Sequence, residues 1–179
     1  MRLVEHDLSG SGVDDATQSV TIADIWEAHK LLKPRIHHTP LAPSRTLRDL
    51  TGADIYLKAE NMQRSGSFKV RGAIYKLSRL CEEEYRRGVI AASAGNHAQG
   101  VAIAAATYHI PCTIVMPETA PLAKVTATQG YGATVVQHGF TYDDAYQYCL
   151  ALQEESGATF IHAFDDPAVI AGQGTLGLE

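Results

Sequence analysis

The sequence of 179 residues predicts an α/β protein in which helices flank a parallel sheet. From residue 54 onward, short apolar runs alternate with longer helical stretches, as they do where crossover helices join parallel strands. Glycine and proline fall at the joints between these runs, where the chain must turn. A hydrophobic fraction of 45% suffices for a buried core, and the length fits one domain or slightly more.

Two helices are expected before the alternating pattern begins. Thr21 and Asp24 suit a capping box that starts the first helix, and Pro34 ends it. A second, shorter helix spans residues 44–51 and is closed by Gly52. The apolar face expected for the first helix comprises Ile22, Ile25, Trp26, His29 and Leu32.

The alternating pattern also gives boundaries for the later elements. We expect strands at residues 55–58, 89–92, 112–116, 134–137 and 159–162. We expect the helices between them at residues 68–80, 97–108, 122–129 and 142–156. Open sheets of this kind bind ligands at the carboxyl ends of their strands. The loop that starts at Ser93 directly follows one such strand, so a site is expected there.

Charge and hydropathy limit the kinds of partner that the protein can bind. The 15 basic and 20 acidic residues give a net charge of −5, which provides no broad surface for nucleic acid. A small-molecule partner is expected instead. No apolar run reaches the roughly 20 residues of a membrane span, and the N-terminus lacks the apolar stretch of a signal peptide. We therefore expect a cytoplasmic protein that does not enter a membrane.

The three cysteines indicate a reducing compartment. Cys81, Cys112 and Cys149 are odd in number, widely spaced, and lie in apolar or helical stretches. This pattern favours buried free thiols over a disulfide framework.

Two small-residue loops carry the chemistry. Lys69 lies where the run Ser65-Gly66-Ser67-Phe68 becomes a helix, and the positive ends of peptide dipoles there favour a neutral, nucleophilic amine. Such an amine suits a Schiff base. The second loop, residues 93–100, contains Gly95, which allows close approach of a ligand to the N–H groups that open the next helix. One loop therefore offers an amine and the other a seat for a carboxylate.

Other motifs in the chain have weaker interpretations. Residues 172–177 match G-x-G-x-x-G, but a helical stretch precedes them instead of a strand, which argues against a dinucleotide site. Residues 95–100 lack the Lys-Ser/Thr that ends a nucleotide P-loop. His37 and His38 are adjacent and have no further ligand in metal-binding spacing, so no metal site is expected.

The two loops resemble those of the pyridoxal-phosphate enzymes of the tryptophan synthase β-type fold, also called fold type II. Within that group the chain is most similar to the threonine dehydratases, or threonine ammonia-lyases. The resemblance runs from about Ile22 to Glu179. Further matching stretches are His38-Thr39-Pro40-Leu41, Tyr56-Leu57-Lys58-Ala59-Glu60-Asn61, Val115-Met116-Pro117 and residues 164–175.

This resemblance implies a cofactor, pyridoxal 5'-phosphate, and a role for each loop residue. Lys69 would form the Schiff base and later, as a free amine, take the α-proton of the substrate. Phe68 would help to wall the cofactor, and Asn96 would hydrogen-bond its phenolic oxygen. The residues that would bind the substrate carboxylate are Ser93, Ala94, Gly95, Asn96 and His97.

The implied reaction is dehydration and deamination of an amino acid. L-Threonine would give 2-oxobutanoate and ammonia, and L-serine would give pyruvate, in either isoleucine biosynthesis or threonine catabolism. Serine racemases of this fold carry serine at the position of Ala94, so the methyl group here favours elimination over racemisation. The parent enzyme is expected to be a homo-oligomer.

Family members continue well past this length, to a glycine-rich loop for the cofactor's phosphate, so we expect the N-terminal half of an enzyme. The alternative is an inactive fragment, or a small-domain module with an incomplete cofactor site. The expected parts are a flexible arm (1–20), N-terminal elements of the larger domain (21–61), a small α/β domain with both loops (62–163), and the return to the larger domain (164–179). Residues 22–32 and those after 164 are expected to lack their packing partners.

Overall fold

A computed structural model describes residues 19–179 of the chain, so the arm expected over residues 1–20 lies almost wholly outside the described residues. In chain order the α-helices are α1 (Ile22–Leu32), α2 (Arg45–Thr51), α3 (Lys69–Leu77), α4 (Glu82–Arg87), α5 (Asn96–Tyr108), α6 (Leu122–Gly130), α7 (Tyr142–Ser156) and α8 (Pro167–Gly174). The strands are β1 (Leu41–Pro43), β2 (Tyr56–Lys58), β3 (Val89–Ala92), β4 (Cys112–Met116), β5 (Thr134–Gln137) and β6 (Thr159–Phe160). Two 3₁₀ turns are η1 (Glu60–Met62) and η2 (Thr175–Leu178). Over this part of the chain, no helix has the length and apolarity needed to cross a bilayer.

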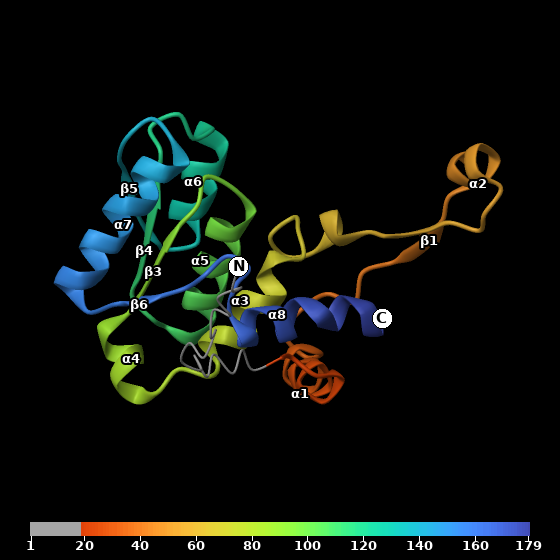
Figure 1. Cartoon of the computed structure of the whole chain (residues 1–179), viewed down its shortest axis with the longest axis horizontal. Helices are drawn as coiled ribbons and strands as arrows, with labels where there is room; N and C mark the ends of the chain where they lie inside the picture. The colour runs from red at the N-terminus through yellow and green to blue at the C-terminus, as the bar shows by residue number, and fades with distance from the viewer. Residues whose placement is uncertain (1–18) are drawn as a thin grey trace, which may run out of the picture.

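The core of the structure is a four-stranded parallel sheet. Its strand order is β5-β4-β3-β6, with Val89 opposite Cys112 and Thr113 opposite Thr134. Helices connect the strands and flank the sheet (Figure 1). The predicted α/β architecture is therefore confirmed.

Both faces of this sheet are covered because its strands are apolar on both sides. Ile90 packs with Ala145 and Cys149 of α7 on one face. The alternate residues Val89 and Ala91 belong to the larger cluster that includes α5, since successive side chains of a strand point to opposite faces. In Figure 1, α7 and α5 lie on opposite sides of β3 and β4.

Glycines allow three helices to approach closely. A Cβ atom on Gly100 of α5 would lie 3.0 Å from the carbonyl carbon of Lys69 in α3. A Cβ atom on Gly172 of α8 would lie 2.6 Å from the Cα atom of Gly72 in α3. Larger residues at these contacts would force the helices apart. Gly172 opens the G-x-G-x-x-G run, so packing against α3 accounts for this glycine.

The strand expected at residues 55–58 is wrong in its assignment to the parallel sheet. It is β2, and it pairs antiparallel with β1, a strand that the sequence did not predict. Together with α2, these strands form an arm that projects from the body of the molecule (Figure 1). Three-residue strands are too short to show a periodicity, and only the tertiary fold brings Leu41 opposite Lys58.

Three other elements differ from the prediction by more than one residue. The helix expected at residues 68–80 is shorter, and the following helix α4 was not expected because all of its residues except Tyr85 are charged. Acidic residues in the first turn of α4 and arginines in its last turn complement its dipole. The strand expected at residues 159–162 ends at Phe160, although the N–H of Ile161 still donates to Ile90.

Helix α1 begins with the predicted capping box, in which the N–H of Thr21 donates to Asp24 at 2.8 Å. Its expected apolar face is wrong at two of the five positions, because Ile22 remains 61% exposed and Trp26 48% exposed. The sequence predicts that α1 and α8 lack packing partners. This prediction is wrong, because the two helices pack against each other. The position of a Cβ on Gly174 is 2.8 Å from the side chain of Ile25, and Leu32 is fully buried.

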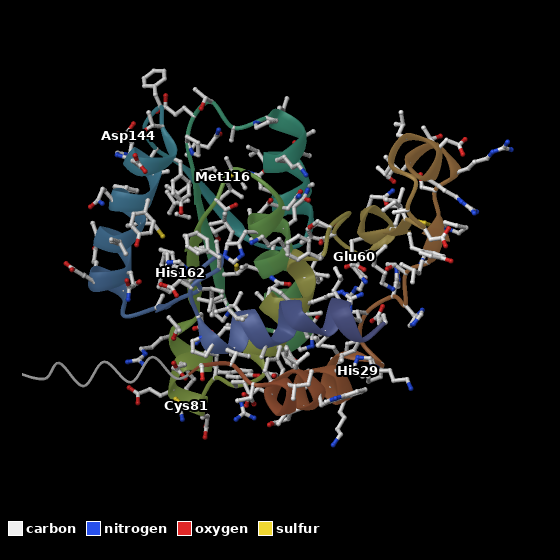
Figure 2. The ribbon with its side chains drawn as sticks, turned by 45° about the vertical axis from the view of Figure 1, so that its right-hand side comes forward. His29, Glu60, Cys81, Met116, Asp144 and His162 are labelled. Carbon is white, nitrogen blue, oxygen red and sulfur yellow. The ribbon has the colours of Figure 1, made fainter. Side chains whose placement is uncertain are left out.

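The cysteine prediction holds for two of the three residues. Cys112 and Cys149 are buried free thiols, and burial raises the pKa of each to about 12. Cys81 is exposed, at the N-terminal boundary of α4 on the outside of the molecule (Figure 2). The sequence prediction was wrong here because it did not anticipate a polar surface helix after Cys81.

Candidate active site

Lys69 is the first residue of α3, and its side chain crosses to the end of β6. Its Nζ atom donates a hydrogen bond of 2.7 Å to the carbonyl oxygen of Ala163. Burial lowers the pKa of Lys69, which is a shift in the direction of the neutral amine. The cause identified here is burial, whereas the sequence argument relied on helix dipoles. The ring of Phe68 lies beside the amine, with 5.5 Å between Nζ and the ring centroid.

The second loop joins β3 to α5 at the carboxyl end of the sheet, where the site was expected. The hydroxyl of Ser93 accepts a hydrogen bond from the N–H of Gly95 at 3.2 Å. Gly95 is the N-cap of α5 and caps the helix with no side chain, and a Cβ placed on it meets no atom within 4 Å. Gly95 thus leaves open space at the N-terminus of α5, where the N–H groups of the first helical turn can bind an anion.

Asn96 opens α5 with its side chain exposed. Its Oδ1 atom accepts a hydrogen bond of 2.9 Å from Nζ of Lys124, a residue of α6. Within residues 19–179, the Nδ2 group of Asn96 donates to no protein atom. Sequence reasoning missed Lys124, because no motif or spacing relates it to a loop 28 residues earlier.

His97 is turned away from the open side of the loop. Its buried ring is hydrogen-bonded through Nε2 to the carbonyl of Ile161 at 2.9 Å, so Nε2 carries the proton. Burial lowers the pKa of His97 to about 4, and Nδ1 has no partner among the described residues. The neutral ring has no further proton to donate. Any contact of His97 with a carboxylate must therefore use its backbone N–H.

The fold brings the two loops together by two routes. Gly100 lies one helical turn after Asn96 and contacts the backbone of Lys69, so the starts of α3 and α5 are neighbours. The chain after β6 is hydrogen-bonded to both loops, through Ile161 to His97 and through Ala163 to Lys69. Ala163 acts through its backbone carbonyl, which sequence patterns do not single out.

A buried ion cluster lies two residues beyond Lys69 in α3. Arg71 is fully buried and donates to both carboxylate oxygens of Glu60 and both of Glu179, at 2.8 to 3.0 Å. Lys58 is 2.7 Å from Glu179. Burial opposes ionisation of Glu179, but the hydrogen bonds from Arg71 and Lys58 outweigh it and lower its pKa to about 2. Glu60 lies near the base of the projecting arm (Figure 2), so the cluster joins the arm to α3.

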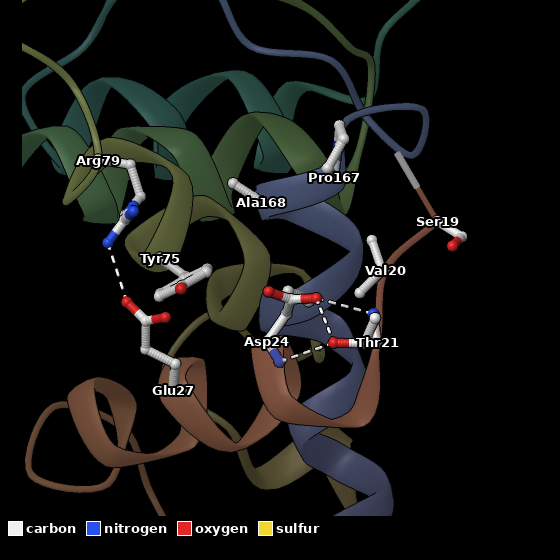
Figure 3. Close-up of a pocket in the computed structure, with 10 residues that line it drawn as sticks. Ser19, Val20, Thr21, Asp24, Glu27, Tyr75, Arg79, Pro167 and Ala168 are labelled. Carbon is white, nitrogen blue, oxygen red and sulfur yellow. Dashed lines mark hydrogen bonds and ion pairs between the residues drawn. The ribbon is translucent and has the colours of Figure 1, made fainter. Parts of the chain in front are cut away.

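A surface pocket of about 380 Å³ lies elsewhere, between α1, α3 and α8. Figure 3 shows that its charged groups are already paired: Arg79 with Glu27 at 3.0 Å, and Asp24 with Thr21. Lys69 and Asn96 do not line this pocket. It is therefore separate from the two loops.

Comparison with known proteins identifies the family. A family model described as pyridoxal-phosphate dependent enzyme matches residues 32–179. The chain belongs to this family. Its members depend on pyridoxal phosphate, so the cofactor expected from the loops is the cofactor of the family.

The pyridoxal-phosphate enzymes most similar to this chain include lyases and a racemase. An L-threonine ammonia-lyase of Thermotoga maritima is 57% identical over 160 residues, which are 89% of this chain and 40% of that protein. The structure of threonine deaminase isoform 2 from Solanum lycopersicum is 41% identical with a TM-score of 0.82, over 99% of this chain and 50% of that one. The structure of maize serine racemase is 36% identical with a TM-score of 0.83, over 88% of this chain and 48% of that one. The chain thus spans half or less of the length of these relatives, and the predicted fold type II is confirmed.

The residues of the two loops fit the family's cofactor. Lys69 offers an amine whose neutral form burial favours, and its hydrogen-bond partner is a carbonyl rather than a carboxylate. Asn96 offers unpaired N–H groups suited to a phenolic oxygen, and Gly95 leaves open space at a helix N-terminus. The chain has no adjacent glycines, so it lacks a glycine-rich phosphate loop of the kind expected in the family.

Proposed function

We propose that this chain supplies the lysine-bearing and asparagine-bearing part of the active site of a dehydratase for L-threonine and L-serine. The observation that carries the proposal is the convergence of Lys69 and the Ser93 loop at one end of the sheet, where the carbonyl of Ala163 is bonded to Lys69 and the carbonyl of Ile161 to His97. The threonine-specific names of the most similar relatives support the substrate class.

Each residue has a distinct task in this reaction. Lys69 would hold the cofactor through its amine and, once displaced, take the α-proton of the substrate; the carbonyl of Ala163 orients that amine. Bound pyridoxal phosphate supplies the sink for the electron pair that deprotonation leaves at the α-carbon. Asn96 would donate to its phenolic oxygen, and Phe68 would wall one side.

The Ser93 loop would hold the substrate carboxylate. The first-turn N–H groups of α5, from Asn96 and His97, would donate to it at the helix N-terminus, where Gly95 leaves open space. Ser93 and Ala94 complete the loop, and Ser93 fixes Gly95 through its hydroxyl. Holding the carboxylate orients the α-hydrogen toward the amine. Loss of that proton and of the β-hydroxyl as water, followed by hydrolysis, gives the 2-oxo acid and ammonia.

A second candidate is amino-acid racemisation, which the similarity to maize serine racemase favours. Racemisation needs a second acid on the opposite face of the cofactor, and the methyl group of Ala94 cannot supply a proton. Elimination is therefore the better proposal.

The division into an arm, a small domain (62–163) and flanking parts of a larger domain belongs to the same proposal, as do a homo-oligomeric parent and a cytoplasmic location.

The test uses a hybrid protein, defined as residues 1–179 of this chain followed by the part of the Thermotoga maritima L-threonine ammonia-lyase beyond its matched region. With pyridoxal phosphate the hybrid should release 2-oxobutanoate from L-threonine, whereas the 179-residue chain alone should not. Lys69→Ala should abolish release and Lys33→Ala, on the exposed end of α1, should not. If the hybrid is folded, as judged by circular dichroism, and binds the cofactor but forms no 2-oxo acid, the proposal that L-threonine is a substrate is overturned. Turnover by Lys69→Ala within about tenfold of the hybrid would overturn the role of the lysine.

A further inference from the structure

Lys124 makes an unusual contact with the start of α5. It is the third residue of α6, and its Nζ atom reaches across to Oδ1 of Asn96 at 2.9 Å and to Oε1 of Gln99 at 3.4 Å. Both partners are side-chain amides. Among residues 19–179, no carboxylate lies within ion-pair distance of Lys124.

This contact fixes which end of the Asn96 amide faces the open loop. An ammonium group only donates hydrogen bonds, so the end of the amide that faces Lys124 must be the oxygen. The Nδ2 group must then point the other way. Without Lys124, the amide could turn by 180° and present its oxygen to a ligand, which would repel an anion. Lys124 thereby holds Asn96 as a donor.

The surroundings of this cation carry further positive charge from helix termini. The N-termini of α5 and α6 both carry partial positive charge, and neither helix has an acidic residue in its first turn. Lys124 adds a full positive charge beside Asn96. Lys124 therefore adds its charge to that of the α5 N-terminus, which would attract an anion to the open side of the loop.

We propose that Lys124 is a positioning residue that acts through Asn96, holding its amide as a donor toward the phenolic oxygen of the cofactor. The proposal rests on the proposed function for the identity of that oxygen. The contact between Lys124 and Asn96 does not depend on the cofactor, so the two can be tested separately.

The first measurement uses the cofactor-free chain. Its two asparagines, Asn61 and Asn96, give two side-chain amide signals when asparagine alone carries ¹⁵N, and Asn61 serves as the internal reference. Lys124→Met should move the Asn96 signals and speed rotation of its amide, because the charged donor to Oδ1 is lost. Lys124→Arg should keep both near the parent values. Asn96 signals that are unchanged in Lys124→Met would overturn the contact between Lys124 and Asn96.

The second measurement uses the hybrid protein loaded with pyridoxal phosphate. Lys124→Met should move the pH midpoint of the visible absorbance to higher pH, because a phenolic oxygen that is held less strongly keeps its proton longer. It should also lower kcat/KM by about tenfold or more, as loss of an aligned donor does. Lys124→Arg should keep the pH midpoint and kcat/KM close to the parent values. The exposed control Lys33→Met should change neither quantity.

A double-mutant cycle separates positioning from a general structural effect. If Lys124 acts through Asn96, Lys124→Met should add less than about twofold to the loss already caused by Asn96→Ala. Independent, multiplicative losses would overturn the proposal. An unshifted spectrum in Lys124→Met, in a hybrid that still dehydrates threonine, would overturn it while leaving the proposed function intact.

Discussion

Gly100 lies against the backbone of Lys69, with only 3.0 Å between the position of a Cβ on Gly100 and the carbonyl carbon of Lys69. Gly100 lies four residues after Asn96 in α5, so the helix that begins at Asn96 contacts Lys69 directly. The distance between the two loops is thus set by the absence of a side chain at one helix position. Because the contact is with backbone, α3 cannot yield by rotating a side chain.

Gly100→Ala should therefore destabilise the chain, despite the better helix propensity of alanine. We expect a loss of about 1 to 3 kcal/mol in the free energy of unfolding, from overpacking between α3 and α5. The matched control is Gly130→Ala in α6, where a Cβ meets no atom within 4 Å; it should be neutral or stabilising by up to about 1 kcal/mol. Urea denaturation measures both. Equal effects of the two variants would contradict the close contact.

The ion cluster around Arg71 should make stability fall in acid. Glu179 has a pKa lowered to about 2 from 4.5, so its contribution is fully present above pH 4.5 and is lost as pH falls toward 2. That contribution is on the order of 3 kcal/mol. Urea midpoints between pH 7 and pH 2 should drop over this window. Glu179→Gln should flatten the dependence, whereas Glu155→Gln, an exposed residue of α7, should not; identical acid profiles for all three proteins would rule the cluster out as the cause.

Thiol reactivity should separate the three cysteines. In the native chain near pH 8, iodoacetamide should modify Cys81 alone, because Cys112 and Cys149 are buried and burial raises the pKa of each to about 12. Mass spectrometry should find all three modified in urea. Native labelling of Cys112 or Cys149 as fast as Cys81 would show that the core around β4 or α7 opens readily.

Ala94→Ser in the hybrid protein should introduce some racemisation. The new hydroxyl could return a proton to the α-carbon from the face opposite Lys69. We expect D-serine to appear when L-serine is supplied, at a rate below that of dehydration, because position alone does not tune the hydroxyl as an acid. Chiral chromatography measures the product. D-serine no higher than in the parent hybrid would count against this role for the site.

Hydrogen exchange should distinguish the buried sheet and helices from the projecting arm. From the expectation that residues 22–32 and those after 164 lack packing partners, the sequence predicts good protection for residues 89–162 and poor protection for residues 1–60 and 164–179. The packing of α1 on α8 changes this expectation, so amides of residues 28–32 should also be well protected. The arm at residues 41–58 should exchange fastest, because no residue of β1, α2 or β2 is buried. Rapid exchange throughout α1 would restore the original expectation.

The sequence determined the parallel sheet and the two loops because their signals are local. Alternating apolar strands and helices specify β3, β4 and β5 almost to the residue, and side-chain chemistry near helix starts singles out Lys69 and the Ser93 loop. A capping box likewise reveals the start of α1 from two residues three positions apart, Thr21 and Asp24.

The tertiary structure decided everything that depends on pairing across long separations. Lys124 meets Asn96 across 28 residues and Ala163 meets Lys69 across 94, and neither partner carries a local pattern that predicts the contact. The antiparallel pairing of β1 with β2 was also invisible, since three-residue strands have no measurable period. The sequence could name the amine and the amide, but their surroundings arise only when helices and strand ends pack against each other.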